Sequence, residues 1–240
     1  MKLLGYTIAS DYPQLPVKGK TVISTINPHS YCVAKRDYEF ETALQASNVL
    51  LPDGVGIVWA AKMLKGQKIQ KIAGFDIFIH LMQHLNAIEG TCFFLGASEQ
   101  TLALIKNRAS VEFPNVTIGS YSPTYKLIFS KEDSTLMCSK VNAFKPQVLF
   151  VGMTAPKQEK WVHEQKDQLN AQILCSIGAV FDFYAGTVKR SSPLWIKLGL
   201  EWLPRFLKEP KRLAERNLIS TPKFILEVFS YKLFKKGFLS

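Results

Sequence analysis

The chain has 240 residues, 47% of them hydrophobic and 12% aromatic, with a net charge of +11 and a pI of about 9.4. This composition supplies a sizeable apolar core, which excludes a disordered chain, and the positive charge favours an anionic partner: a phosphorylated substrate, lipid headgroups or nucleic acid. The four cysteines stand far apart, without a CxxC or Cys/His cluster, which disfavours a zinc site or a disulfide framework and favours a reducing cytoplasm.

Short apolar runs that predict strands alternate along the chain with amphipathic runs that predict helices. We expect strands at residues 20–26, 49–51, 91–95, 116–121, 147–153 and 173–179. We expect helices at 31–46, from the turn at Asp53 to about Leu64, at 77–85 behind an Asp76 cap, from about 96 onward and at 134–144. Continuous apolar runs are typical of buried parallel strands. The order therefore predicts an α/β fold with a Rossmann-like, mostly parallel sheet flanked by helices.

Polar or glycine-bearing loops follow the predicted strands, at Thr25, Asp53, Gly96, 121–125, 152–158 and 178–182. In open α/β sheets, ligands bind outside the carboxyl ends of the strands. We therefore predict a substrate site at this edge, with Asn27, Gly96 and Tyr125 among its binding residues. Asp53, at the mouth of a Pro-Asp-Gly turn, either caps the helix behind it or offers its carboxylate to a substrate.

The segment from Lys189 to Ser240 differs from the rest of the chain. It holds twelve Lys or Arg and four Glu, so it carries +8 of the net charge of +11. It is also rich in aromatic residues, and Pro204, Pro210 and Pro222 predict that it is broken into short helices. Two interpretations stay open: an appendage that lies on an anionic membrane surface, or a terminal helical hairpin packed on the core.

We accordingly divide the chain into a catalytic α/β core, residues 1–190, and a helical, membrane-associating appendage, residues 191–240. No stretch is apolar for long enough to span a bilayer as a helix, and the short apolar N-terminus does not predict a signal peptide. We expect a cytoplasmic protein associated peripherally with the inner face of the cell membrane.

Several enzyme classes lack their signature motifs. The sequence contains no GxxxxGK[ST], GxSxG, HExxH or Asp-x-Asp, and only a partial echo of GxGxxG at Asp53. Anionic groups would then be bound by Arg, Lys and backbone N–H donors. Arg205, Arg212 and Arg216 are candidates, and the last two are one helical turn apart. The alternative for these arginines is a solvated charged face.

Six ordered segments together resemble the WecG/TagA/CpsF glycosyltransferases (glycosyltransferase family 26). They are Thr25–His29, Pro52–Ala61, Ala73–Asp76, Val151–Trp161, Phe181–Arg190 and Gly199–Arg212. The resemblance implies a metal-independent, inverting transferase without a cofactor. It would move a sugar from a UDP-sugar to a polyprenyl-diphosphate-linked sugar at the membrane. The products in this family are enterobacterial common antigen, wall teichoic acid linkage units and capsular polysaccharide.

The resemblance also implies roles for individual residues. Asp53 matches the proposed catalytic base, Thr25 the threonine beside it, and Gln158 the glutamine of the site. Asp182 falls at a predicted strand end suited to the uridine. The arginines 205, 212 and 216 are thought to reach the diphosphate when the appendage folds over the site.

Two positions depart from the family pattern. Lys71 stands where arginine is common, which keeps the charge of a predicted substrate-binding residue but loses bidentate recognition of a phosphate. Pro204 stands where an aromatic residue is common. The donor sugar stays open among N-acetylmannosamine, its uronate and other hexoses, and a homo-oligomer is possible.

Two functions other than sugar transfer have weaker support in the sequence. A non-enzymatic basic module that binds anionic lipid or nucleic acid is supported by charge alone, and the chain has no helix-turn-helix or RNP-like signature. We therefore expect no nucleic-acid partner. An NAD-dependent enzyme is poorly supported without a complete GxGxxG.

Overall fold

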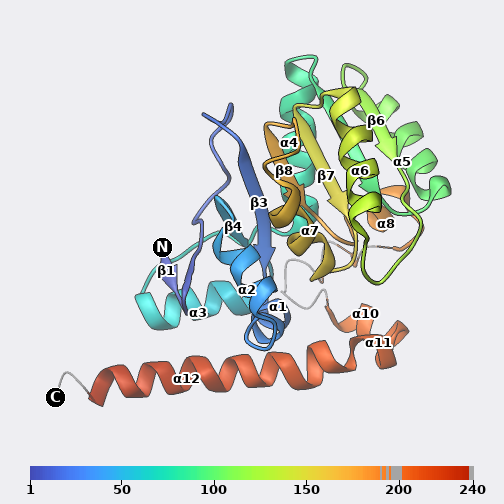
Figure 1. Cartoon of the computed structure of the whole chain (residues 1–240). Coiled ribbons are helices and arrows are strands. Elements are labelled where there is room, and N and C mark those ends of the chain that lie inside the picture. The colour runs from blue at the N-terminus through green and yellow to red at the C-terminus, as the bar shows by residue number, and fades with distance from the viewer. Residues whose placement is uncertain (190, 193–194, 196–201, 238–240) are drawn as a thin grey trace.

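A computed structural model describes residues 1–189, 191–192, 195 and 202–237, without the side chains of Arg205, Lys208, Arg212 and residues 234–237. Six parallel strands form the central sheet in the order β4-β3-β8-β7-β5-β6 (Figure 1). They are β3 Thr21–Ile26, β4 Val49–Pro52, β5 Thr91–Gly96, β6 Thr117–Tyr121, β7 Val148–Gly152 and β8 Ile173–Ser176. The α/β class and the parallel sheet predicted from the sequence are confirmed.

Helices connect the strands and cover the sheet. They are α1 Pro28–Ala34, α2 Tyr38–Gln45, α3 Val55–Lys65, α4 Gly74–Ala87, α5 Glu99–Glu112, α6 Lys131–Phe144, α7 Lys157–Gln165 and α8 Val180–Ala185. A small antiparallel pair, β1 Lys2–Leu3 and β2 Tyr6–Thr7, stands apart from the main sheet. The sequence pattern did not predict this pair, because two-residue strands leave no periodic signal.

Alternate residues of each central strand face opposite sides of the sheet, as the two-residue period of a strand requires. In β5, Cys92 and Phe94 join a core formed with α4, α5 and α8. Phe93 and Leu95 join a second core on the other face, formed with α6 and α7. The sheet is therefore buried on both faces, which explains why its strands are apolar throughout rather than alternating.

Helix boundaries near the sheet edge differ from the predicted ones. The single helix expected at 31–46 is two helices, because Asp37 is extended and its side chain accepts the backbone N–H of Phe40 as the N-cap of α2. The predicted cap at Asp76 is also wrong: α4 begins earlier, with Ala73 at its N-cap. The Asp76 carboxylate instead accepts the backbone N–H of Ala73 at 3.0 Å. Helix α3 ends at Lys65, close to the expected end at about Leu64, and Gly66 is its C-cap with φ of 66°.

The described part of the C-terminal segment holds helices α10 Trp202–Lys208 and α11 Pro210–Ala214, a π-helix η1 Glu215–Ser220, and α12 Thr221–Gly237. The expectation that Pro222 interrupts this segment is wrong. Pro222 lies in the first turn of the 17-residue α12, directly after η1. A proline cannot donate an N–H and crowds the preceding turn, and the wider π-turn before it accommodates both effects.

Helix α12 packs along α1 and α3 at one side of the molecule (Figure 1). Phe224 and Val228 are fully buried there, in a third core that includes Tyr31, Ile57 and Ala60. The Phe224 ring meets Tyr31 edge-on, with 5.3 Å between ring centroids. Among the described residues, no helix combines the length and the apolarity needed to cross a bilayer.

We expect Phe224→Ala to lower the free energy of unfolding by about 3 kcal/mol, because it removes a fully buried ring and leaves a cavity. Urea unfolding followed by circular dichroism measures the change. Leu226→Ala is the matched control, since this side chain of the same helix is 66% exposed. Equal losses in the two variants would contradict the packing of α12 on the core.

Candidate active site

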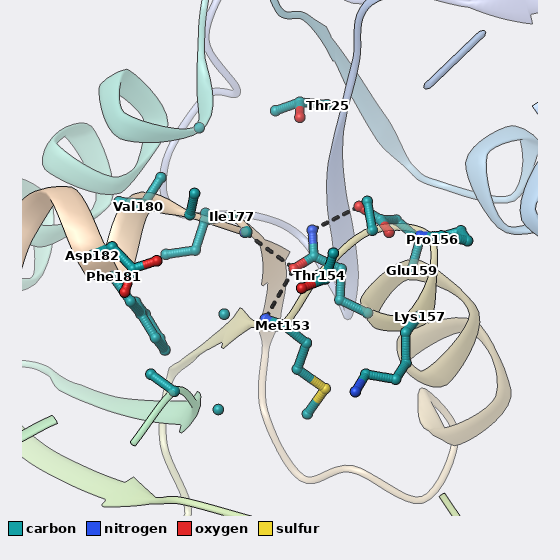
Figure 2. A pocket seen from close by; sticks show the side chains of 18 of the residues that line it. Thr25, Met153, Thr154, Pro156, Lys157, Glu159, Ile177, Val180, Phe181 and Asp182 are labelled. Carbon is teal, nitrogen blue, oxygen red and sulfur yellow. Dashed lines mark hydrogen bonds between the residues drawn. The ribbon is translucent and has the colours of Figure 1, made fainter. Parts of the chain in front are cut away.

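A cavity of about 1020 Å³ opens at the carboxyl edge of the parallel sheet. It is lined by Thr25 of β3, Asp53 after β4, Gly96 of β5, Gly152 of β7 and Ile177 after β8. Figure 2 shows part of this cavity, with Thr25 on one side and Asp182 and Lys157 on others. Five neighbouring strands thus contribute to a single site at the edge where α/β proteins bind ligands.

Asp53 is held at the end of β4 by its backbone. The strand register pairs Ile26 with Pro52, and the N–H of Asp53 donates to the carbonyl of Ile26 at 2.9 Å. The chain then turns at Gly54, whose φ of 89° favours glycine. Gly54 occupies the N-cap position of α3. The alternative in which Asp53 is the N-cap of this helix is therefore wrong, and its carboxylate lines the cavity.

Asn27 joins the start of α1 to Asp53. Its Oδ1 accepts the backbone N–H groups of His29 and Ser30, each at 3.0 Å. Its Nδ2 donates to Oδ2 of Asp53 at 3.2 Å. Both ends of this amide are thus used, one to cap α1 and one to orient the carboxylate. Asn27, predicted as a substrate-binding residue, lines the cavity and also positions Asp53.

Gln158 ties together the ends of two neighbouring strands. Its Oε1 accepts the backbone N–H of Met153 and that of Gly178, each at 3.1 Å. Its Nε2 donates to Oε1 of Glu159 at 2.7 Å. Gln158 is only 4% exposed. The amide is therefore fixed in the cavity wall between the loops that follow β7 and β8.

Glu159 is a buried carboxyl group in the same wall. Its Oε2 has no hydrogen-bond partner among the described residues. Burial disfavours the charged form, and it raises the pKa of Glu159 to about 7 from an ordinary value of 4.5. Glu159 can therefore be neutral close to physiological pH, unlike an exposed glutamate.

Glycine allows a close approach of chain segments at the floor of the cavity. A Cβ on Gly152 would lie 2.2 Å from the ring of Phe181. This contact lets α8 pack against the end of β7. Asp182 lies in the first turn of α8, not at the end of a strand as predicted, and it lines the cavity.

Cationic side chains lie around the cavity. Arg216 reaches it from η1, and Lys157 from the first turn of α7. Lys157 Nζ donates to the carbonyl of Lys126 at 2.7 Å and lies 5.0 Å from the ring centroid of Tyr125. Burial lowers the pKa of Lys157. Tyr125 is itself 79% exposed and belongs to the loop that lines the cavity after β6.

His29 connects the cavity to the C-terminal segment. Its Nδ1 lies 2.9 Å from Oγ of Ser220 in η1. Burial, and then the nearby charge of Arg216, lower the pKa of His29. The neutral imidazole can therefore share this hydrogen bond at physiological pH, and the bond helps to place η1 over α1.

The cavity brings together most of the residues predicted from the sequence: Thr25, Asn27, Asp53, Gly96, Tyr125, Gln158, Asp182 and Arg216. Lys71, between α3 and α4, is not among the described residues that line it. The side chains of Arg205 and Arg212 lie outside the described part of the structure. The roles assigned to all these residues stay predictions.

Three residues that line the cavity are not among the site residues predicted from the sequence: His29, Lys157 and Glu159. Charged residues at the start of a helix usually face solvent, so only the position of Glu159 and Lys157 beside Gln158 could have drawn attention to them. No group of three or more His, Cys, Asp or Glu side chains in the described ranges is placed to hold a metal ion.

Comparison with known proteins gives a consistent family assignment. A sequence profile of the "Glycosyl transferase WecG/TagA/CpsF family" matches residues 10–237. A curated relative from Bacillus subtilis (strain 168), an N-acetylglucosaminyldiphosphoundecaprenol N-acetyl-beta-D-mannosaminyltransferase, is 32% identical over 90% of this chain and 82% of the relative. Proteins of the same name from Bacillus spizizenii and Staphylococcus aureus (strain MW2) are 29% and 27% identical. The alignment with the Bacillus spizizenii protein covers 90% of this chain and 80% of the relative, and that with the Staphylococcus aureus protein covers 89% and 79%. The chain therefore belongs to the WecG/TagA/CpsF family of glycosyl transferases.

Proposed function

We propose that the chain transfers an N-acetylmannosaminyl group from its UDP-sugar to N-acetylglucosaminyl diphosphoundecaprenol, with inversion and without a metal ion. The names of the relatives support the transferred sugar and the lipid acceptor. The residues of the cavity support the chemistry. A product of this type would enter cell-envelope polysaccharide, such as the linkage unit of teichoic acid.

The observation that carries the proposal is the place of Asp53. Its carboxylate lines a cavity at the carboxyl edge of the sheet and accepts a hydrogen bond from Asn27. In the proposed reaction, a hydroxyl of the acceptor sugar gives its proton to Asp53 as its oxygen attacks the anomeric carbon. The bond from that carbon to the UDP oxygen breaks, and UDP leaves with the electron pair from the opposite face.

The negative charge that develops on the leaving UDP needs stabilisation. Arg216 and Lys157 line the same cavity, and in a site shielded from water such cations act strongly on developing charge. We propose that they, with Arg205 and Arg212 of the C-terminal segment, meet the diphosphate. Thr25 and Asp182 are proposed to contact the acceptor sugar and the uridine, respectively.

The C-terminal segment is proposed to bring the site to the membrane. Beyond the buried side of α12, Leu226 and Leu233 are 66% and 69% exposed, and Leu218 of η1 is 62% exposed. Lys223 and Lys232 of α12 are also exposed. Exposed apolar side chains beside lysines favour binding at an anionic lipid surface. We propose a peripheral position at the inner face of the membrane, where the lipid-linked acceptor would lie.

Asp53→Asn is expected to lower kcat by a factor of about 10² to 10⁴, since an amide cannot take the proton of the acceptor. Transfer of radiolabelled sugar from UDP-N-acetylmannosamine to a synthetic polyprenyl diphosphate acceptor measures the change. Asp37→Asn is the control, because Asp37 caps α2 outside the cavity. Full activity in Asp53→Asn would exclude Asp53 as the base.

Replacing Leu226 and Leu233 together by serine is expected to weaken binding to vesicles of phosphatidylglycerol and phosphatidylcholine by about thirtyfold, because each leucine contributes about 1 kcal/mol when partly buried in lipid. Co-sedimentation with the vesicles gives the binding constant. The control replaces Val111 and Leu136, which are 80% and 47% exposed on α5 and α6. An equal loss in this control would count against α12 as the membrane-binding element.

A further inference from the structure

Gln158 and Glu159 form a buried, hydrogen-bonded pair that takes no part in the proposed reaction steps. We propose that Glu159 is a positioning residue, which holds the Gln158 amide so that one N–H of this amide donates to a diphosphate oxygen of the bound sugar nucleotide. The identity of this ligand rests on the proposed function. The arrangement of the two side chains does not.

The orientation of the Gln158 amide is determined by its neighbours. Two backbone N–H groups, from Met153 and Gly178, point to one end of the amide, each at 3.1 Å. Only the carbonyl oxygen can accept from them, because the NH₂ group is a donor. The NH₂ group must therefore occupy the other end, which lies 2.7 Å from the Glu159 carboxyl.

A count of hydrogen atoms then leaves one donor. The NH₂ group carries two hydrogens, and one of them goes to Oε1 of Glu159. Within the described residues, Nε2 of Gln158 has no second acceptor. Gln158 lines the cavity. The second N–H is therefore available to a ligand oxygen, and the oxygen of this amide is not.

Gln158 is the side-chain hydrogen-bond partner of the Glu159 carboxyl in the described part of the chain, and this carboxyl also lies in the first turn of α7. One of its oxygens accepts from Gln158, and the other has no partner. Glu159 is 5% exposed, so an apolar side chain would fill the same space without burying a polar group. The acceptor for Gln158 is what the carboxyl adds. Without it, the NH₂ group would have no partner to hold it until the ligand arrives.

The diphosphate is the ligand group that suits this donor. A sugar nucleotide carries its charge on the diphosphate oxygens, which accept hydrogen bonds and do not donate them. The amide lies where the loops after β7 and β8 meet, in the cavity that Lys157 and Arg216 also line. A neutral N–H donor adds directional contact to the charge that these cations supply.

Three variants separate positioning from packing. Glu159→Gln keeps an acceptor for Gln158, so UDP affinity and kcat are expected to stay within about threefold of wild type. Glu159→Met keeps the length of the side chain but removes the acceptor, and about tenfold losses are expected in both. The double variant Gln158→Glu with Glu159→Gln exchanges the donor and the acceptor of the pair. The carboxylate at position 158 then accepts from the backbone N–H groups of Met153 and Gly178 and from the NH₂ group at position 159.

The double variant is the decisive one, because it keeps the internal hydrogen bonds and the net charge of the pair but presents no N–H from residue 158. We expect its melting temperature to stay close to that of wild type and its UDP affinity, measured by calorimetry, to fall at least tenfold. In ¹⁵N-labelled wild type, UDP is also expected to slow the exchange of one Gln158 amide proton with water.

Wild-type UDP affinity in the double variant or in Glu159→Met, or failure of UDP to slow this exchange, would overturn the inference. Wild-type protein that binds UDP as described but does not transfer sugar to the lipid acceptor would overturn the proposed function alone. Absence of UDP binding by wild type would overturn both.

Discussion

All six strands of the central sheet point in one direction, and the rest of the molecule depends on this constraint. Parallel strands must be joined by crossovers, so every strand ends at the same edge and every following loop starts there. Residues as distant in sequence as Thr25, Gly96 and Ile177 therefore line one cavity. Burial of both sheet faces leaves this edge as the place where the sheet can present polar groups to a ligand.

At that edge, amide side chains fix the groups that would otherwise move. Asn27 links the first turn of α1 to the carboxylate of Asp53. Gln158 links the loops after β7 and β8 to each other. In both cases a side chain satisfies backbone N–H groups and still presents a donor to a carboxyl group. Hydrogen bonds to the main chain thus hold the side chains of the site in place. Side chains that are already fixed lose less entropy on ligand binding than free side chains would.

The fold was predictable because its signal is repeated: apolar runs of strand length recur in order, and turn residues follow them. The position of Asp53 in a Pro-Asp-Gly turn at the end of a predicted strand was visible for the same reason. Local departures from the regular helical pattern were not predictable. Asp37 divides what looks like one helix, and η1 allows Pro222 to remain within a helical segment. The buried state of Glu159 was also hidden, since the burial of a residue in the first turn of a helix depends on tertiary packing and leaves no local sequence signal.

The π-helix has a consequence for the alignment of the C-terminal segment. Arg216, Ser220, Phe224 and Val228 recur every four residues. In an α-helix of 3.6 residues per turn, two residues four positions apart are offset by about 40° around the helix axis. A π-turn holds more than four residues, so the offset between residues four positions apart has the opposite sign. With η1 covering the first step, Arg216 can face the cavity while Ser220, Phe224 and Val228 stay buried along the core. A single angular correction thus aligns an arginine that lines the cavity with the residues that anchor the helix.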